Sequence, residues 1–210
     1  MKWEGFEILG EYVLQRKREF NLIPQERKKQ LTRLASAITH DLSLECSADL
    51  IFICTHNSRR SHMAHIWAQM ASLNYKIVGV RCFSGGTEAT AFNSLAVEAL
   101  EISGLQIEQM DESPNPEYQV SFPDLDDRIS VFSKKYEDPP NPTNNFIAVM
   151  TCSDADEACP LVEGASSRHA ITYEDPKAYD GTPEEMARYE ERSQQIAREM
   201  LFLFSMVKLI

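Results

Sequence analysis

The sequence lacks long apolar runs, has few cysteines, and has fewer basic than acidic residues. No stretch approaches the about 18 apolar residues that a membrane-spanning helix needs, so we expect no membrane partner. The 210 residues include five cysteines, a small and odd number that excludes a disulfide scaffold. Lysine and arginine total 21 against 32 acidic residues, and the net charge of -11 argues against a nucleic-acid partner.

The early part of the chain also has no signal-peptide pattern, because charged residues at 16–19 interrupt its apolar residues. We therefore expect a cytoplasmic protein with reduced thiols, in which closely placed cysteines serve catalysis rather than structure. Its length suits one sizeable core, or a core with a small appendage. We expect a monomer or a weak dimer.

Residues 1–48 have a helical pattern. Pro24 suits a first helical position, and the apolar residues after it recur at helical spacing: Leu31, Leu34, Ala35 and Ile38. We interpret this part as a helical extension packed on a main domain at 49–210. An arm that binds a partner or a second copy is the alternative.

Strand and helix patterns alternate from residue 49 onward. Strands are predicted at Leu50–Cys54, Lys76–Phe83, Phe146–Cys152 and Arg168–Tyr173, and helices between them at Ser61–Leu73 and Ala91–Ser103. A last helix is predicted to begin with Thr182 as its cap and Pro183 in its first turn. The alternation predicts a three-layer α/β fold, with a parallel four-stranded sheet flanked by helices.

Residues 112–145 differ from the rest of this part, because they contain six prolines. Polar and apolar residues alternate at Tyr118–Phe122 and Ile129–Phe132, which predicts an insertion that carries a hairpin near the rim of the site. A plain surface insertion is the alternative.

Cys54 directly follows an apolar strand pattern, and Arg60 stands six residues later at the start of a predicted helix. Backbone N–H groups of such a turn, the helix N-terminus and a guanidinium would surround a tetrahedral oxyanion with positive charge. The same field favours the thiolate form of a nucleophilic cysteine. We predict that Cys54 and Arg60 are catalytic, with an oxyanion-binding loop of Thr55, His56, Asn57, Ser58, Arg59 and Ser61.

Two further thiols follow a later predicted strand. Cys152 and Cys159 are seven positions apart, roughly 10 Å along a helix, which is too far for a relaxed disulfide. A pair that can bond only after a conformational change suits a redox relay. Asp175, held by the following Pro176, is a candidate proton donor to a leaving oxygen.

Other interpretations of the cysteines and histidines are less specific. Cys152 and Cys159 could be coincidental buried cysteines, and with His169 they are conceivable zinc ligands, but the spacing fits no common zinc pattern and we predict no metal. Cys82 is predicted to lie in the core. His56 and His62 flank the loop and could tune the thiolate, but we expect them to be solvated.

Taken together, these segments resemble the low-molecular-weight protein tyrosine phosphatase family, and most of all its thioredoxin-coupled arsenate reductases. The resemblance covers about residues 49–205 apart from the insertion. It is carried by the loop at Ile53–Ala64, by Ser84-x-Gly86-x-Glu88, by Thr151–Pro160 with its two cysteines, and by Asp175-Pro176.

The resemblance implies a cascade of three thiols. Cys54 would attack arsenate, with Arg60 neutralising the oxyanion and Asp175 helping an oxygen leave as water. Cys152 would then attack Cys54 and release arsenite, and Cys159 would attack Cys152. Reduced thioredoxin would open the resulting disulfide, and no bound cofactor is implied.

The chain departs from the family pattern at three positions. His56 replaces a glycine, and it would be strained if the turn needs a positive φ there. Arg59 replaces a cysteine and adds positive charge at the rim, which could tighten anion binding or alter substrate choice. His65 replaces an acidic residue associated with potassium binding, so no potassium is predicted.

Two other functions remain open at this point. A phosphatase that hydrolyses phosphomonoesters through a Cys54 phosphocysteine would need only Cys54, Arg60 and Asp175. A non-catalytic module that senses oxyanions or redox state would follow if His56 distorts the loop.

Overall fold

A computed structural model describes residues 4–123, 128–159 and 161–208 of the chain. The helices are α1 (Glu4–Arg18), α2 (Gln25–Glu45), α3 (Arg60–Asn74), α4 (Ser94–Ile102), α5 (Ser153–Ala158) and α6 (Glu185–Ser205), with short 3-10 helices η1 (Phe20–Leu22) and η2 (Pro176–Tyr179). The strands are β1 (Ala48–Cys54), β2 (Val80–Gly86), β3 (Gln106–Gln109), β4 (Tyr118–Ser121), β5 (Ile129–Val131), β6 (Phe146–Met150) and β7 (Ala165–Ala170).

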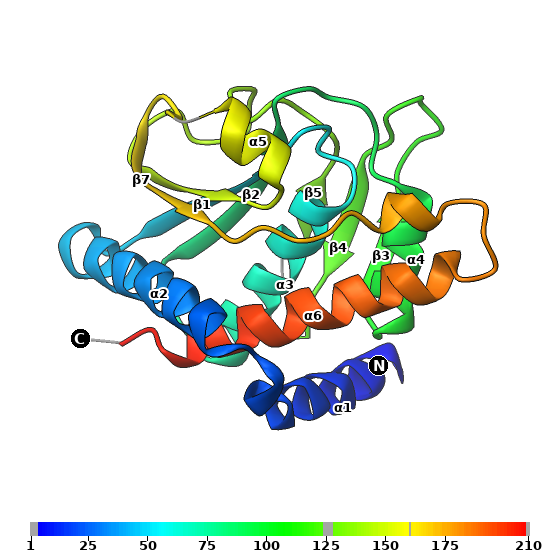
Figure 1. The fold of residues 1–210 in the computed structure, drawn as a ribbon, viewed down its shortest axis with the longest axis horizontal. Coiled ribbons are helices and arrows are strands. Elements are labelled where there is room, and N and C mark those ends of the chain that lie inside the picture. Colours follow the sequence, from blue (N-terminus) through cyan, green and yellow to red (C-terminus); the bar gives the residue numbers. More distant parts are fainter. Residues whose placement is uncertain (1–3, 124–127, 160, 209–210) are drawn as a thin grey trace.

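Four strands form one parallel sheet in the order β2-β1-β6-β7 (Figure 1). The central strand β1 places Cys54 opposite Gly86 of β2 and Ile53 opposite Met150 of β6. The predicted fold class is therefore confirmed. Because all four strands run the same way, their carboxyl ends meet along one edge of the sheet, where ligands bind in open α/β sheets.

Both faces of the sheet are buried, as a parallel sheet requires. Alternation along β1 sends Leu50 and Phe52 to one face and Ile51 and Ile53 to the other. The first face packs against α2 and α3, with α6 behind α3. The second face packs against α5 and the chain around Tyr136.

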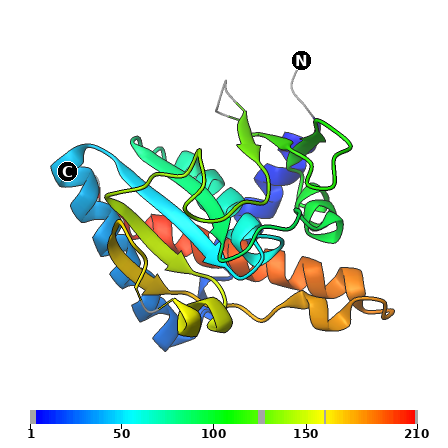
Figure 2. The same cartoon turned by 90° about the horizontal axis from the view of Figure 1, so that it is seen from above.

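The N-terminal helices pack on the rest of the molecule. α1 lies against α6, and α2 contacts β1, β7 and α6 (Figures 1 and 2). The predicted stripe of α2 is buried: Leu31, Leu34, Ala35 and Ile38. Pro24 precedes the helix as its cap rather than occupying its first turn. The division into an extension at 1–48 and a domain at 49–210 stays a prediction.

The insertion forms a hairpin of β4 and β5, close to the predicted segments. β3, which was not predicted, joins it to form a second, antiparallel sheet that lies beside the parallel one (Figure 2). Residues 124–127 of the insertion lie outside the described residues. The chain after β5 reaches the loop that follows Cys54, through Ser133 and Lys134.

Several predicted boundaries were wrong. The strand predicted at Arg168–Tyr173 is β7 at Ala165–Ala170, and the helix predicted at Ala91–Ser103 is α4 at Ser94–Ile102. β2 begins at Val80 rather than Lys76, because positive φ angles at Lys76 and Gly79 turn the chain before the strand starts. α6 begins at Glu185, later than predicted, because Thr182 belongs to a preceding turn, where its hydroxyl donates to the carbonyl of Tyr179 and accepts from the N–H of Glu184.

Within the described residues, no helix is both long and apolar enough to cross a membrane.

Candidate active site

Adjacent strand ends bring the predicted catalytic residues to one edge of the sheet. Cys54 is the last residue of β1, and Cys152 follows the neighbouring strand β6 by two residues. The chain beyond β7 continues alongside, with the Tyr173 N–H donating to the carbonyl of Thr151, and it leads to Asp175. The described part of the chain thus confirms that these segments meet, although they are far apart in sequence.

The loop after Cys54 turns at Asn57, which has a φ of 44°. Asparagine is one of the few non-glycine residues that adopt this left-handed conformation readily. His56 does not have a positive φ, so the strain expected at that position is absent. The replacement of glycine by histidine is accommodated because the sharp turn falls one residue later.

The carbonyl groups of the loop are held by neighbouring segments. The carbonyls of Cys54, Thr55 and Ser58 accept from backbone N–H groups of residues 87, 88 and 93. The carbonyl of His56 accepts from the hydroxyls of Thr90 and Ser133. Among the described residues, no acceptor is bound to the N–H groups of 55–59, so these donors are available to an anion.

Gly86 allows β2 to pass directly beside this loop. A Cβ at this position would lie 2.7 Å from the Asn57 nitrogen and 2.3 Å from the carbonyl oxygen of Glu88. No side chain fits such a gap, because non-bonded heavy atoms pack at about 3.5–4.0 Å. The glycine therefore belongs to the architecture of the loop.

A buried hydrogen-bond chain leads from Cys54 into the protein. The Cys54 Sγ lies 3.1 Å from the Ser61 Oγ, which accepts from the Asn57 Nδ2 at 2.9 Å. The Oδ1 atom of Asn57 accepts from the backbone N–H of Lys134, also at 2.9 Å. Each of these groups is fully or nearly fully buried, so the chain orients the thiol without water.

Arg59 and Arg60 both bind Asp175. The Arg59 Nε lies 2.9 Å from Oδ1, and the Arg60 Nη2 lies 2.7 Å from Oδ2. Arg60 also donates to the carbonyl of Tyr173 at 3.0 Å. Arg59 adds positive charge beside the loop, and this charge is buried and paired with the Asp175 carboxylate.

Burial alone would raise the pKa of Asp175, but the guanidinium groups of Arg60 and Arg59 outweigh it. The net effect, helped by the backbone N–H of Lys177, lowers the pKa of this carboxyl below its ordinary value. Asp175 is therefore a carboxylate at neutral pH in this structure. It can accept a proton there, but it has none to donate.

The two later cysteines lie at opposite ends of α5. Cys152 is fully buried, and its Sγ accepts from the Ala155 N–H as the helix cap and lies 3.5 Å from the Thr55 Oγ1 of the loop. Cys159 is half-buried at the other end, and both thiols are free. Pro160, which completes the predicted redox motif, lies outside the described residues.

The histidines near the loop differ from expectation. His56 is exposed, with its Nε2 3.8 Å from a Glu88 carboxylate oxygen. His62 was expected to be solvated but is fully buried, with its Nδ1 3.1 Å from the Ser84 Oγ and its ring stacked on Phe92. Burial, reinforced by the Lys134 charge, lowers the pKa of His62 well below its ordinary value, and the pKa of His65 to about 3.

Sequence patterns did not predict several residues that contact the site. Ser133 and Lys134 come from the insertion and hold the loop. Arg168 of β7 donates to the carbonyls of Asp156 and Cys159 at the end of α5. A basic residue on an edge strand and a serine in a proline-rich insertion are too common to predict such contacts. Cys82 is buried in β2 as predicted, and burial raises its pKa.

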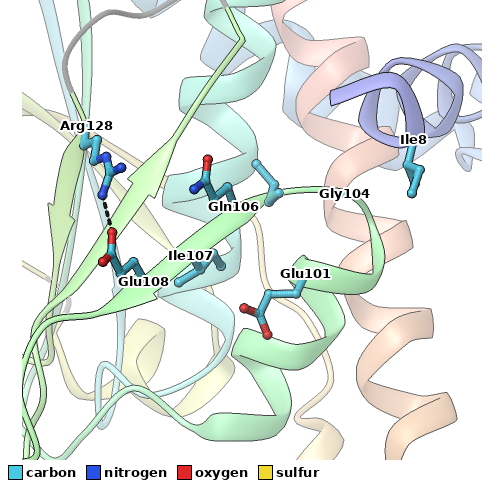
Figure 3. A pocket seen from close by; sticks show the side chains of 8 residues that line it. Ile8, Glu101, Gly104, Gln106, Ile107, Glu108 and Arg128 are labelled. Carbon is cyan, nitrogen blue, oxygen red and sulfur yellow. Dashed lines mark hydrogen bonds and ion pairs between the residues drawn. The ribbon is translucent and has the colours of Figure 1, made fainter. Parts of the chain in front are cut away.

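A cavity of about 620 Å³ lies away from the thiols, where α1 faces the end of α4 and β3 (Figure 3). Ile8 and Glu101 line it on one side, and an ion pair between Arg128 and Glu108 lines it on the other. None of the predicted site residues lines it. Within the described ranges, no group of three or more histidines, cysteines and acidic residues is arranged to hold a metal ion.

Comparisons with known proteins bear on the family of this chain. No protein-family model matches it. The arsenate reductase of Bacillus subtilis (strain 168) is 30% identical over 137 residues, which are 65% of this chain and 79% of that protein. The chain belongs to the family of this arsenate reductase.

A second arsenate reductase and a solved structure are also similar to the chain. The arsenate reductase of Bacillus licheniformis is 28% identical over 138 residues, again 65% of this chain and 79% of that protein. A low-molecular-weight protein tyrosine phosphatase from T. tengcongensis has a TM-score of 0.49 and 18% identity, covering 76% of this chain and 99% of that chain. The chain is an enzyme of the arsenate reductase family described above, and the roles of its individual side chains remain predictions.

Proposed function

We propose that this enzyme reduces arsenate to arsenite by a cascade through Cys54, Cys152 and Cys159. The observation that supports this most is the position of the second thiol: the Cys152 Sγ lies 3.5 Å from the Thr55 Oγ1, in the loop that begins at Cys54. A phosphatase of this fold needs no thiol there.

In the first step, the Cys54 thiolate attacks arsenic, with the free N–H groups of the loop and Arg60 around the oxyanion. Dihydrogen arsenate and the thiolate give a Cys54–S–AsO₃ dianion and water, so the As–S bond forms as an As–O bond breaks. The loop donors favour this step because they act on a buried charge.

In the second step, the Cys152 thiolate attacks the Cys54 sulfur. A Cys54–Cys152 disulfide forms, the S–As bond breaks with its electron pair on arsenic, and arsenite leaves after taking up protons. Arsenic gains two electrons and the two thiols lose them.

In the third step, the Cys159 thiolate attacks Cys152 and frees Cys54. Seven residues at about 1.5 Å rise separate these thiols by roughly 10 Å across α5, beyond the reach of a disulfide, so α5 must unwind. We propose thioredoxin, as in the reductases that the chain resembles, as the donor that reduces the Cys152–Cys159 bond.

The test is thioredoxin-coupled turnover of arsenate with mass spectrometry of the disulfides. We expect Cys152→Ser and Cys159→Ser to abolish steady turnover, and Cys159→Ser to accumulate a Cys54–Cys152 bond. Cys46→Ser is the control, because Cys46 is exposed at the end of α2. Steady turnover in both relay variants would defeat the cascade.

Phosphomonoester hydrolysis is the second candidate, and it is supported by the hydrogen bond between Arg60 and Asp175, two of the three groups that it needs. An aryl phosphate assay separates the two functions. Hydrolysis that persists in a Cys152→Ser, Cys159→Ser double variant, without arsenate turnover by the wild type, would favour the phosphatase.

A further inference from the structure

Arg59 is an ion-pair partner of Asp175 that does not depend on Arg60. Its Nε and Nη2 lie 2.9 Å and 3.5 Å from the two carboxylate oxygens. Arg60 touches only Oδ2, and its other terminal nitrogen binds the carbonyl of Tyr173. Both guanidinium groups are nearly buried, with 10% of each side chain exposed, so neither pair is a solvated surface contact.

An oxyanion above Cys54 competes with Asp175 for Arg60. A guanidinium binds a tetrahedral oxyanion through two of its N–H groups. Arg60 uses Nη1 for Tyr173 and Nη2 for Asp175, and its Nε has no partner among the described residues, so an oxyanion can bind at Nε and share the charge of Arg60 with Asp175. When a bound oxyanion neutralises the charge of Arg60, the charge of Arg59 remains beside the carboxylate. Asp175 therefore keeps a positive partner throughout the reaction.

Building on the function proposed above, we propose that Arg59 determines which substrates react. By holding Asp175 as a carboxylate, it favours oxyanions that carry their own proton, such as arsenate, over phosphomonoesters whose leaving alcohol must be protonated by the enzyme.

Arsenate and phosphomonoesters differ in the source of the proton that the leaving oxygen takes up. Dihydrogen arsenate supplies both hydrogens of the water that leaves when Cys54 attacks. A phosphomonoester dianion has no proton, so the alkoxide released as the P–O bond breaks must take one from an acid. A carboxylate cannot supply it. A weakly basic leaving group such as 4-nitrophenolate departs without it.

Apart from the two arginines, the groups near Asp175 are a backbone N–H and side chains that are paired with other residues. The Lys177 backbone N–H donates to Oδ1 at 3.1 Å, and Tyr189 of α6 faces the site with its hydroxyl bound to Asp180. Glu174 is paired with Arg192. Within the described residues, Arg59 and Arg60 are the cations in contact with the Asp175 carboxylate, and their charges lower its pKa against the opposing effect of burial.

The test compares kcat/KM for phenyl phosphate and 4-nitrophenyl phosphate, which differ in the basicity of the leaving group. We expect Arg59→Gln to shift the ratio toward phenyl phosphate by on the order of tenfold or more, within the usual contribution of a general acid. Its phenyl phosphate activity should fall as pH rises and Asp175 ionises. Arg192→Gln, which removes a nearby cation that does not touch Asp175, should leave the ratio unchanged.

Asp175→Asn distinguishes a proton donor from a change in anion binding. Added to Arg59→Gln, it should cancel the shift in the kcat/KM ratio toward phenyl phosphate. Introduced alone into the wild type, it should leave that ratio nearly unaltered. If Arg59→Gln fails to fold, Arg59→Lys, which keeps one donor, should shift the ratio less but in the same direction. Any of three results would overturn the proposal. These are equal changes in kcat/KM for both phosphates, a gain that survives Asp175→Asn, and no phosphate hydrolysis by Arg59→Gln.

These assays use neither arsenate nor thioredoxin. A wild type that fails to turn over arsenate would sink the proposed cascade, whereas the ratio would still report on Arg59 and Asp175.

Discussion

Asn57 has a left-handed backbone conformation in the loop after Cys54. Its φ of 44° is tolerated because asparagine adopts the left-handed region, and its amide bonds both Ser61 and the backbone of Lys134. Asn57 thus adopts the backbone conformation that the turn needs, and its side chain links Cys54, through Ser61, to the insertion. The sequence predicted Asn57 as a loop residue, but it placed the expected strain at His56, because spacing does not reveal which peptide unit turns.

Lys134 provides a test at the residue scale. Burial lowers its pKa to about 8, and Asp138 only partly opposes this. The unfolded chain keeps this proton up to about pH 10.4, so between pH values of about 8 and 10.4 the unfolded state binds more protons and folding stability rises with pH. Below this window both states are protonated, and the cost of the buried charge is fully present.

Lys134→Met should remove that rise and raise the free energy of unfolding near neutral pH by up to roughly 3 kcal/mol. The backbone N–H that binds Asn57 is kept. Urea unfolding at several pH values between about 7 and about 10 measures the effect. Lys135→Met is the matched control, because Lys135 is exposed. A difference from wild type that does not vary with pH would contradict the assignment.

At the scale of elements, α5 is a short helix fixed at its end by another strand. Its six residues are too few to be stable alone, and Arg168 of β7 holds the carbonyls of Asp156 and Cys159 at 2.7 Å and 3.1 Å. The sequence predicted the two thiols at opposite ends of a helical segment. It did not predict the guanidinium that holds this segment in place.

Arg168→Ala should speed formation of the Cys152–Cys159 disulfide under a mild oxidant, by on the order of tenfold if about 1.4 kcal/mol of helix stabilisation is lost. The reason is that α5 must unwind before these thiols meet. Quenched alkylation with mass spectrometry follows the bond. Arg81→Ala, which breaks an exposed ion pair with Asp49, is the control. An unchanged rate would mean that α5 opens independently of Arg168.

At the scale of the whole molecule, the N-terminal helices share the core of the α/β part. Leu9 and Val13 of α1 and Leu34 of α2 belong to the cluster that lines one face of the sheet. Tyr12 stacks on Trp67 of α3, with 5.3 Å between ring centroids. Arg27 of α2 donates to the carbonyl of Thr172, in the segment that leads to Asp175. Unfolding of the two parts should therefore be coupled.

Leu34→Ala should lower the free energy of unfolding by about 2–5 kcal/mol, because the side chain is fully buried. It should do so in one transition that far-UV and near-UV circular dichroism report alike. Leu44→Ala, at an exposed leucine of the same helix, is the control. Two separated transitions would instead mean that residues 1–48 unfold as a unit of their own.

The sequence by itself determined most elements of the parallel-sheet part and the positions of the thiols, although not β3. Apolar periodicity predicts strands and helices because each depends on neighbours within a few residues, and a parallel sheet then requires Cys54 and Cys152 to emerge at one edge. Only the tertiary structure decided which groups those residues meet. Arg59 finds Asp175 across 116 positions of the chain, His62 is buried under Phe92, and Lys134 holds Asn57, because such partners are selected by packing between distant segments.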